Sequence, residues 1–271
     1  MTALEQARAV RGRVAPIGVI GGSSRVVEHN LYVYRRLWPM FLTGFFEPVF
    51  YLLGIGFGIG GLVGTVTVGG EHISYSVFVA PALMASAAMN GAIFDATFGL
   101  FYQLKYAKTY EAMLATPITV GSVSLGAVGW AVLRGGLYSG VFLVVMAFLG
   151  LVHSLLGILM LPAAILVGFT FASLGTAAAT FIRSWDDFDL MNLVLLPLFL
   201  FSATFFPITV YPGALQVVVE LSPLYRAIDL MRDLGLGQPS WSMIPDVAYL
   251  LALSALGLWI TSRRMIKRLR P

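Results

Sequence analysis

Six apolar stretches, each long enough to cross a lipid bilayer as a helix, dominate this sequence. A transmembrane helix needs about 20 predominantly apolar residues, because every backbone polar group inside the bilayer has to be hydrogen-bonded within the protein. Only 11% of the residues are charged and the mean hydropathy is +0.86, whereas soluble domains carry about 25% charged residues. We therefore predict an all-α polytopic membrane protein without a separate soluble domain. The predicted spans are approximately 40–62, 74–101, 119–150, 155–182, 189–209 and 243–262.

The basic residues predict how these spans are oriented. Lys and Arg are enriched in the cytoplasmic segments next to transmembrane helices. With six spans and both termini in the cytoplasm, every Lys and Arg except Arg134, Arg226 and Arg232 lies on the cytoplasmic side. We therefore predict a multi-pass protein of the cell membrane with cytoplasmic N- and C-termini. The formal net charge of +4 does not indicate nucleic-acid binding, because the basic residues flank apolar spans instead of forming a stripe.

Two cytosolic segments precede the first span. Residues 1–22 are polar and basic and predict a flexible tail. Residues 23–38 predict a helix that Ser23 or Ser24 caps. An apolar face would place this helix in the membrane interface. The residues of that face are Val27, Leu31, Tyr34 and Trp38. The charged residues predicted to meet the lipid headgroups are Arg25, Glu28, Arg35 and Arg36.

A short amphipathic helix is predicted over residues 103–116, on the cytosolic side between the second and third spans. Pro117 ends it, because Pro disfavours helical geometry in the preceding residue. Tyr106, Tyr110, Met113 and Leu114 follow the i, i+4, i+7, i+8 spacing of one helix face. The helix could rest on lipid or bind a partner protein, and we favour the partner. The predicted contact residues are Tyr106, Lys108, Thr109, Tyr110, Glu111, Met113 and Leu114.

Three charged residues fall inside predicted spans, where a charge costs several kcal/mol. They are Glu47, Asp95 and Arg134. At a rise of ~1.5 Å per residue, Glu47 and Asp95 lie ~10 Å from the cytosolic boundary, and Arg134 lies ~20 Å from it. A pair with either acid would need a long reach or a shifted helix boundary. The alternatives are a structural ion pair, snorkelling toward the interface, and a proton relay.

The segment 207–242 is apolar and interrupted by prolines. It predicts two short helices, Gly213–Leu221 and Leu224–Leu234, that enter the outer leaflet or lie on it. Non-helical backbone at membrane depth has to be covered by protein or water, so this outer re-entrant element is a pore lid or a packing plug. Its assigned residues are Pro207, Pro212, Gly213, Pro223, Arg226, Asp229 and Arg232.

The sequence contains no recognisable catalytic or nucleotide-binding motif. G-x-x-x-x-G-K-[ST], G-x-S-x-G and H-E-x-x-H are all absent. Residues 56–61 match G-x-G-x-x-G but lie in an apolar span, where small residues four apart indicate close helix packing, within one chain or between subunits. Asp186, Asp187 and Asp189 predict a solvated turn and helix start. With no cysteine and scattered histidines, we predict no metal site, no bound cofactor and no enzymatic activity.

The order and spacing of several segments resemble the type-2 ABC exporter permeases, and within them the permeases for nodulation lipo-oligosaccharides and related antibiotic-resistance exporters. No single segment is decisive, because all are apolar and loosely defined. The sequence departs from the family pattern at Ala203-Thr204, where Ser-Gly is usual, and this change predicts a stiffer turn. The segments that carry the resemblance are residues 47–56, 80–90, 109–118, 196–207, 212–213 and 221–232.

This resemblance implies that residues 39–271 form a permease that pairs with a second copy of itself or a sibling. It implies two copies of a cytosolic ABC ATPase subunit, which bind ATP and Mg. The helix over 103–116 would dock into the ATPase as a coupling helix, and the helix over 23–38 would be the connecting helix at the membrane surface. The substrate implied is amphipathic: a lipid-linked saccharide, a glycolipid or a hydrophobic drug, moved outward from the cytoplasmic side or the inner leaflet.

An ATP-independent channel or ion-coupled carrier is the alternative function. Glu47, Asp95 and Arg134 would then carry ions or protons across the membrane. Secondary carriers often contain two similar halves, and this sequence shows no clear internal repeat. We therefore favour the ATP-driven permease.

Overall fold

The computed structural model describes residues 18–35, 46–68, 70–107, 109–114, 116 and 118–269. Within these residues, five helices are long and apolar enough to cross a membrane. They are Phe46–Val63, Tyr75–Gln103, Gly121–Phe148, Leu155–Ala179 and Met243–Met265. These helices correspond to the first, second, third, fourth and sixth predicted spans, and they confirm the all-α membrane class.

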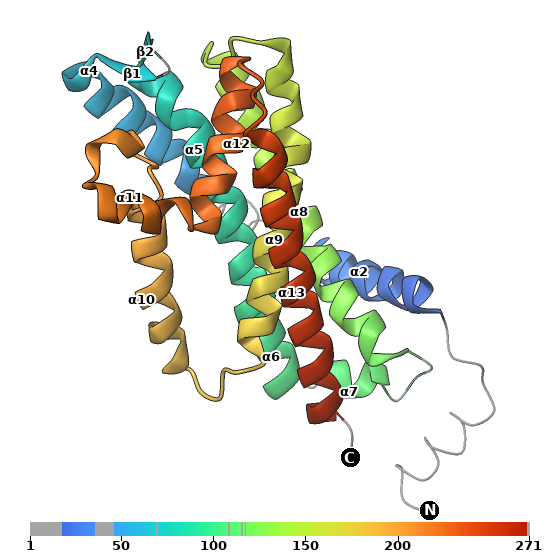
Figure 1. The fold of residues 1–271 in the computed structure, drawn as a ribbon. Coiled ribbons are helices and arrows are strands. Elements are labelled where there is room, and N and C mark those ends of the chain that lie inside the picture. Colours follow the sequence, from blue (N-terminus) through green and yellow to red (C-terminus); the bar gives the residue numbers. More distant parts are fainter. Residues whose placement is uncertain are drawn as a thin grey trace, which may run out of the picture.

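Figure 1 shows the helices side by side as a bundle, with α7 at one end and the β1–β2 hairpin at the other. We name these the α7 end and the hairpin end. In chain order the elements are α2 (Val19–Arg35), η1 (Leu52–Ile59), α4 (Gly60–Val63), β1 (Thr65–Val68), β2 (Glu71–Ser74), α5 (Tyr75–Phe94), η2 (Asp95–Gly99), α6 (Leu100–Lys105), α7 (Thr109–Leu114), α8 (Val120–Phe148), η3 (Leu155–Leu159), α9 (Met160–Ala179), α10 (Asp187–Leu200), η4 (Ile208–Val210), α11 (Gly213–Glu220), α12 (Pro223–Leu236) and α13 (Met243–Leu269).

The predicted fifth span, 189–209, is too long. α10 has 14 residues and so a length of ~21 Å, which is short of the ~30 Å hydrocarbon core. The helix stops because the chain turns over residues 201–206, where Ala203 adopts a left-handed φ of 54°. The polypeptide then continues through η4 and α11 beside the end of α10 (Figure 1).

The connection between the first and second predicted spans forms a β-hairpin, which the sequence analysis does not predict. β1 and β2 pair antiparallel from Thr65↔Ser74 to Val68↔Glu71. Alternating β-branched residues followed by Gly69-Gly70 are a hairpin signal, and the sequence carries it as T-V-T-V-G-G. An emphasis on apolar length alone misses this signal.

The core of the bundle is built around α9, which packs against α5, α8 and α13. The α9–α13 seam consists of small and hydroxylated residues, as is typical of membrane helices. Ser254 Oγ donates to Thr170 Oγ1 at 3.0 Å, and the hydroxyls of Thr176 and Thr261 lie 3.1 Å apart. At Gly257 the two backbones meet: a Cβ there would lie 2.6 Å from the carbonyl carbon and oxygen of Ser173.

Replacing Gly257 by Ala is therefore expected to destabilise the protein by about 1–2 kcal/mol, because overpacking forces the two backbones apart. Gly168, inside α9, is the matched control: it is buried, but no atom of another described segment lies within 4 Å of the position of its Cβ. Gly168→Ala should raise the free energy of unfolding by about 0.5–1 kcal/mol through helix propensity. Denaturant titration in detergent micelles measures both. Equal stability changes in the two variants would contradict the close backbone contact.

Helix α2 crosses α8 with a face that the sequence does not predict. It begins at Val19, so neither Ser23 nor Ser24 is its N-cap. Gly22 and Val26 are buried, whereas Leu31 of the predicted apolar face is 55% exposed. The crossing depends on small residues, since a Cβ on Gly126 of α8 would lie 2.5 Å from the Cβ of Val26. Periodicity identifies the most apolar face of a helix. The face of α2 that packs on α8 is instead the one with small side chains, because these allow the two backbones to come close.

The G-x-G-x-x-G segment lies in a span, as predicted, and its glycines divide between two faces. Gly56 and Gly60 lie against Ser76 and Tyr75 at the start of α5. Gly54, Gly58 and Gly61 have no described atom within 4 Å of their Cβ positions. The first pair therefore belongs to a seam within the chain. The glycines on the other face stay open to lipid or to a second molecule.

Candidate functional site

The predicted cytosolic helix over 103–116 is interrupted. α6 ends at Lys105, and the amides of Tyr106 and Ala107 both donate to the Tyr102 carbonyl oxygen, at 2.9 and 3.0 Å. This sharing ends the regular hydrogen-bond ladder, and α7 starts anew at Thr109. The prediction of one continuous helix is therefore wrong, and Tyr106 does not share a helix face with the residues of α7.

Helix α7 packs onto the bundle through Met113. This side chain is half-buried against a cluster formed by α2, α6, α8, α9 and α13, whose buried members are Val26, Leu100, Val123, Ala127, Ala179 and Met265. Thr109 is half-buried and Ala112 is exposed. Lys108 lies outside the described residues, as do the side chains of Tyr110, Glu111 and Leu114. Of the predicted contact residues with described side chains, Met113 contributes part of its surface to the bundle.

Aromatic rings from three segments gather at the α7 end of the bundle. The segments are the α5–η2–α6 helix, the turn after α6, and the start of α10. Trp185 packs against Phe98, Phe101, Tyr106 and Phe188, with ring centroids 5.1–5.7 Å apart, and its Nε1–H donates to the Tyr106 hydroxyl at 2.6 Å. The members of this α7-end aromatic cluster are Phe94, Phe98, Phe101, Tyr102, Tyr106, Trp185 and Phe188.

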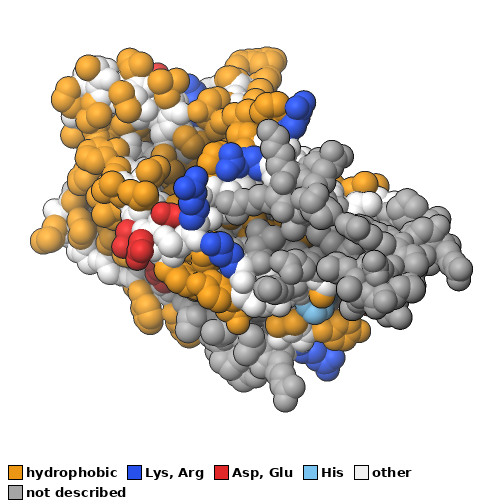
Figure 2. All heavy atoms as spheres, turned by 90° about the horizontal axis from the view of Figure 1, so that it is seen from below, with side chains coloured by type: hydrophobic (Ala, Val, Ile, Leu, Met, Phe, Trp, Pro, Cys, Tyr) orange, Lys and Arg blue, Asp and Glu red, His pale blue; other side chains and the backbone are white. Residues whose placement is uncertain are grey.

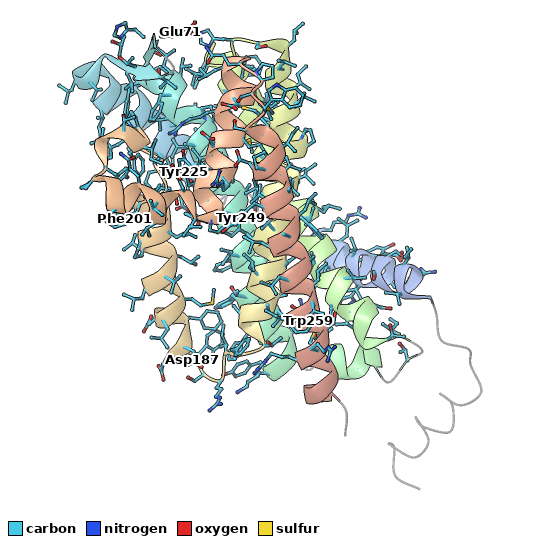
Figure 3. All side chains as sticks on the ribbon, viewed as in Figure 1. Glu71, Asp187, Phe201, Tyr225, Tyr249 and Trp259 are labelled. Atoms are coloured by element: carbon cyan, nitrogen blue, oxygen red, sulfur yellow. The ribbon has the colours of Figure 1, made fainter. Side chains whose placement is uncertain are left out.

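The acidic run before α10 is a turn and helix start, as predicted. Asp187 Oδ2 accepts hydrogen bonds from the backbone amides of Arg183, at 2.6 Å, and Ser184, at 3.2 Å. The bond from the Arg183 amide, followed by that from Ser184, lowers the pKa of this exposed carboxyl. The Lys105 ammonium donates to the Arg183 carbonyl oxygen. Figure 3 places Asp187 at the α7 end of α10 and Phe201 at the other end.

Two of the three predicted intramembrane charges form an ion pair. Arg134 of α8 donates to Asp95, the first residue of η2, and its Nε donates to the Tyr138 hydroxyl at 3.0 Å. Both charged residues are only 9% exposed. Glu47 is exposed and forms no ion pair within the described part of the chain. Of the three predicted alternatives, the structure therefore shows the structural ion pair, formed by Asp95 and Arg134 without Glu47.

The two short helices predicted within segment 207–242 are present, as α11 and α12. Pro207 and Pro212 immediately precede η4 and α11. Pro223 occupies the first turn of α12, whose N-cap Ser222 accepts from the Tyr225 amide at 3.3 Å. Arg226 donates to Asp246 of α13 at 3.0 Å, and Asp229 is half-buried.

Arg232 of α12 holds the turn over residues 201–206 in place. This guanidinium is 7% exposed and donates to the carbonyl oxygens of Ala203 at 2.6 Å, Thr204 at 3.2 Å and Phe78 at 3.3 Å. It also lies over the Phe78 ring, 3.8 Å from the centroid. Non-helical backbone at this depth therefore has its hydrogen bonds satisfied by protein, as the membrane requires. These contacts favour the packing plug over a freely swinging lid.

Two helices in contact through Tyr51 and Phe199 expose many apolar side chains. They belong to α10, none of whose residues is buried, and to the helix Phe46–Val63. A shallow groove on the latter is lined by Phe46, Glu47, Phe50 and Tyr51. The exposed large side chains on α10 are Leu190, Leu193, Val194, Leu196 and Leu200. Lipid or another protein has to cover a surface of this kind.

Comparison with known proteins agrees with this architecture. The family model of the ABC-2 type transporter matches residues 25–235, from within α2 to the last turn of α12. This chain belongs to the ABC-2 type transporter family. It is thus a multi-pass membrane permease subunit, and permeases of this family generally work with an ATPase subunit and often as dimers.

The relatives of the permease that match most of its length are nodulation proteins. Nodulation protein J of Rhizobium leguminosarum bv. viciae is 36% identical over 194 residues, which cover 71% of the permease and 73% of the relative. Nodulation protein J of Neorhizobium galegae is 33% identical over 237 residues, or 87% of each chain. That of Rhizobium meliloti (strain 1021) is 30% identical over 226 residues, covering 83% and 85%.

Sequence reasoning did not identify Trp185 or its bond to Tyr106. Aromatic residues such as Phe98 and Phe101 are visible in the second span, but packing against lipid explains most of them from the sequence, with substrate contact as the alternative. The available signal was a Trp followed by acidic residues, W-D-D-F, just after an apolar span. Such a Trp sits at the membrane interface, at the same level as the end of the neighbouring span.

Proposed function

We propose that the permease is the membrane half of an ATP-driven exporter of an amphipathic substrate, energised by separate ATPase subunits. The family match over residues 25–235 carries this proposal, together with the absence of a nucleotide-binding motif from the sequence. ATP and Mg are bound by two copies of a cytosolic ABC ATPase. The permease pairs with a second copy of itself or with a sibling permease.

The ATPase subunits bind at the α7 end. Figure 2 views the molecule from this side and shows Lys and Arg side chains on it, beside an acidic group. Arg183 and Arg263 are exposed there, and the Arg263 guanidinium lies 5.2 Å from the ring centroid of the exposed Trp259 (Figure 3). Basic residues next to interfacial Trp mark the cytoplasmic boundary of membrane proteins, which supports cytoplasmic termini and an outer hairpin end.

The substrate crosses along the open apolar side formed by Phe46–Val63 and α10. An amphipathic molecule has an apolar part that suits the exposed Phe50 and Leu193, and its polar part needs a polar group such as the nearby Glu47. The name of the relatives, nodulation protein J, together with the resemblance to lipo-oligosaccharide permeases, favours a lipid-linked saccharide within this class. The channel alternative loses support because Asp95 and Arg134 neutralise each other.

Alanine at both Tyr110 and Glu111 is expected to reduce copurification of the ABC ATPase at least 10-fold and to abolish its stimulation by the permease. The reason is that α7 lies at the end of the bundle and exposes Ala112. The side of α7 that faces away from the bundle is therefore available to the ATPase. The measurement is copurification after coexpression with an ABC ATPase of the same host. ATP hydrolysis is then followed in liposomes containing phospholipid, glycolipid or a hydrophobic dye.

His72→Ala is the matched control, because His72 is exposed on β2 at the hairpin end. It should leave copurification and hydrolysis within 2-fold of the unmodified permease. Unchanged ATPase association and stimulation in the double alanine variant would count against docking at α7. Flux through liposomes that contain the permease alone would instead establish the channel alternative.

A further inference from the structure

We infer that Trp185 is a positioning residue that transmits movement of the α6–α7 turn to α10. The inference rests on the proposed function, in which the ATPase moves α7. It deepens that function by naming the connection through which α10, beside the proposed substrate path, responds to ATP.

Helix α10 is suited to move as a unit because it packs weakly. None of its residues is buried, and it packs on the core through half-buried side chains only, those of Met191, Leu195, Leu198 and Phe199. Its ring contacts to the bundle lie near its two ends. Phe188 contacts Phe98 and Phe101 at the α7 end, and Phe199 contacts Tyr51 at the other. A push at either end therefore displaces the helix more easily than a push on the core helices.

The α6–α7 turn is joined directly to the connection that leads into α10. Tyr106 lies three residues before the start of α7, and its hydroxyl accepts the Trp185 Nε1–H bond at 2.6 Å. Their rings are stacked with centroids 5.4 Å apart. The preceding residue, Lys105, donates to the Arg183 carbonyl oxygen. Displacement of α7 therefore pulls on residues 183–185 through two adjacent contacts.

Besides its contact with Tyr106, Trp185 contacts the first turn of α10. Its ring lies 5.7 Å from that of Phe188, in the first turn of α10, and Asp187 fixes the intervening turn through the amides of Arg183 and Ser184. The buried Phe101 meets the Trp185 ring edge to face at 81°. Trp185 thus contacts the α6–α7 turn, the core and α10 together. The buried Phe101 also contacts Tyr106 and Phe188, but Trp185 adds the hydrogen bond to the turn.

The absence of cysteine from the sequence provides a test that needs no substrate. Leu193→Cys on α10 and Leu137→Cys on α8 place spin labels on two exposed sites. Pulsed electron spin resonance then measures their distance distribution in the permease–ATPase complex, with and without ATP and vanadate. We expect a shift on trapping with the otherwise unmodified permease. Trp185→Ala should remove at least three quarters of this shift, while ATPase copurification and basal hydrolysis stay within 2-fold.

Further variants separate the relay from general packing. Trp185→Phe keeps a ring but removes the donor, so it should lose about half of the shift. Tyr106→Phe should match it, and the double Phe variant should be no worse than either, because one hydrogen bond is removed in all three. Trp241→Ala, at an 87% exposed Trp, is the control that leaves the shift unchanged.

The outcomes distinguish the two proposals. A full shift in Trp185→Ala, with the ATPase bound and active, would overturn the relay and leave the proposed function intact. Failure of the unmodified permease to bind any ABC ATPase would overturn the proposed function itself. Loss of the shift together with loss of ATPase binding in Trp185→Ala would assign Trp185 to the docking surface and also refute the relay.

Discussion

Arg134→Met is expected to lower the free energy of unfolding of the permease by about 3–5 kcal/mol, the usual cost of removing one partner from a buried ion pair. Met preserves most of the apolar stem of Arg134 but removes the cation that faces Asp95, and the remaining carboxylate is 9% exposed. Arg134 donates to Oδ1 of Asp95, and the Oδ2 atom is buried without a hydrogen-bond partner within the described part of the chain. A charge left in this position has neither water nor protein to stabilise it.

The double variant Asp95→Leu/Arg134→Met is expected to recover most of this loss, because replacing both charges by apolar side chains of similar size is often neutral. Unfolding in detergent micelles, analysed as a double-mutant cycle, measures the coupling between the two residues. Arg263→Met, at an exposed arginine on α13, is the control and should change stability by no more than about 0.5 kcal/mol. A double variant less stable than either single variant would mean that the charges have a role beyond pairing.

The same pair shows where sequence reasoning about membrane depth reaches its limit. Both residues were correctly placed inside spans, but the predicted second span ended at residue 101. The helix continues to Lys105, so Asp95 lies ten residues, or ~15 Å, from its end. Arg134 is 14 residues, or ~21 Å, from the start of α8 at Val120. The remaining difference between these two depths, ~6 Å, is within the reach of an arginine side chain. An error of four residues in one boundary was enough to hide the contact.

Long apolar helices were predictable because length and composition alone define them. The features that could not be predicted depend on contacts between distant segments. The end of α10 at Leu200 depends on a turn whose carbonyl groups are hydrogen-bonded by Arg232, about 30 residues later in the chain. The face that α2 presents to α8 depends on Gly126, about 100 residues later. Neither dependence leaves a local periodic signal, so local pattern reasoning extends the fifth span too far and does not find the face of α2 that packs on α8.

The departure from the family pattern at Ala203-Thr204 connects a local sequence feature with a contact between distant segments. The sequence predicts a stiffer turn than the Ser-Gly usual in the family, and Ala203 occupies a left-handed φ of 54°, which costs a residue with a Cβ roughly 1–2 kcal/mol. The surrounding structure has to compensate for this strain. Ala203 is fully buried with Val219 and Tyr225, and its carbonyl oxygen accepts the 2.6 Å hydrogen bond from Arg232. The strained turn and the buried arginine are therefore parts of one arrangement.

Arg232→Met should accordingly destabilise the hairpin end of the permease by about 3 kcal/mol or more. It leaves the carbonyl oxygens of Ala203 and Thr204 without their donor, and each orphaned buried group costs about 1–3 kcal/mol. It also removes the stacking on Phe78. Arg232→Lys keeps the charge but lacks the planar group that bonds two carbonyl oxygens and stacks on a ring, so we expect an intermediate loss.

Hydrogen exchange resolved to residues 201–206 distinguishes local opening from global unfolding, because exchange reports local free energies directly. In Arg232→Met, the amides of this turn should exchange at least 10-fold faster. The exchange rates of the α9 amides in the core should change far less. Arg25→Met is the matched control: its exposed pair with Glu28 is worth less than about 1 kcal/mol, and it lies far from the turn in sequence and on another helix. If Arg232→Met exchanged like the unmodified permease over 201–206, the turn would be held by its apolar contacts with α11 and α12, and the arginine would serve only to neutralise nearby acids such as Asp229.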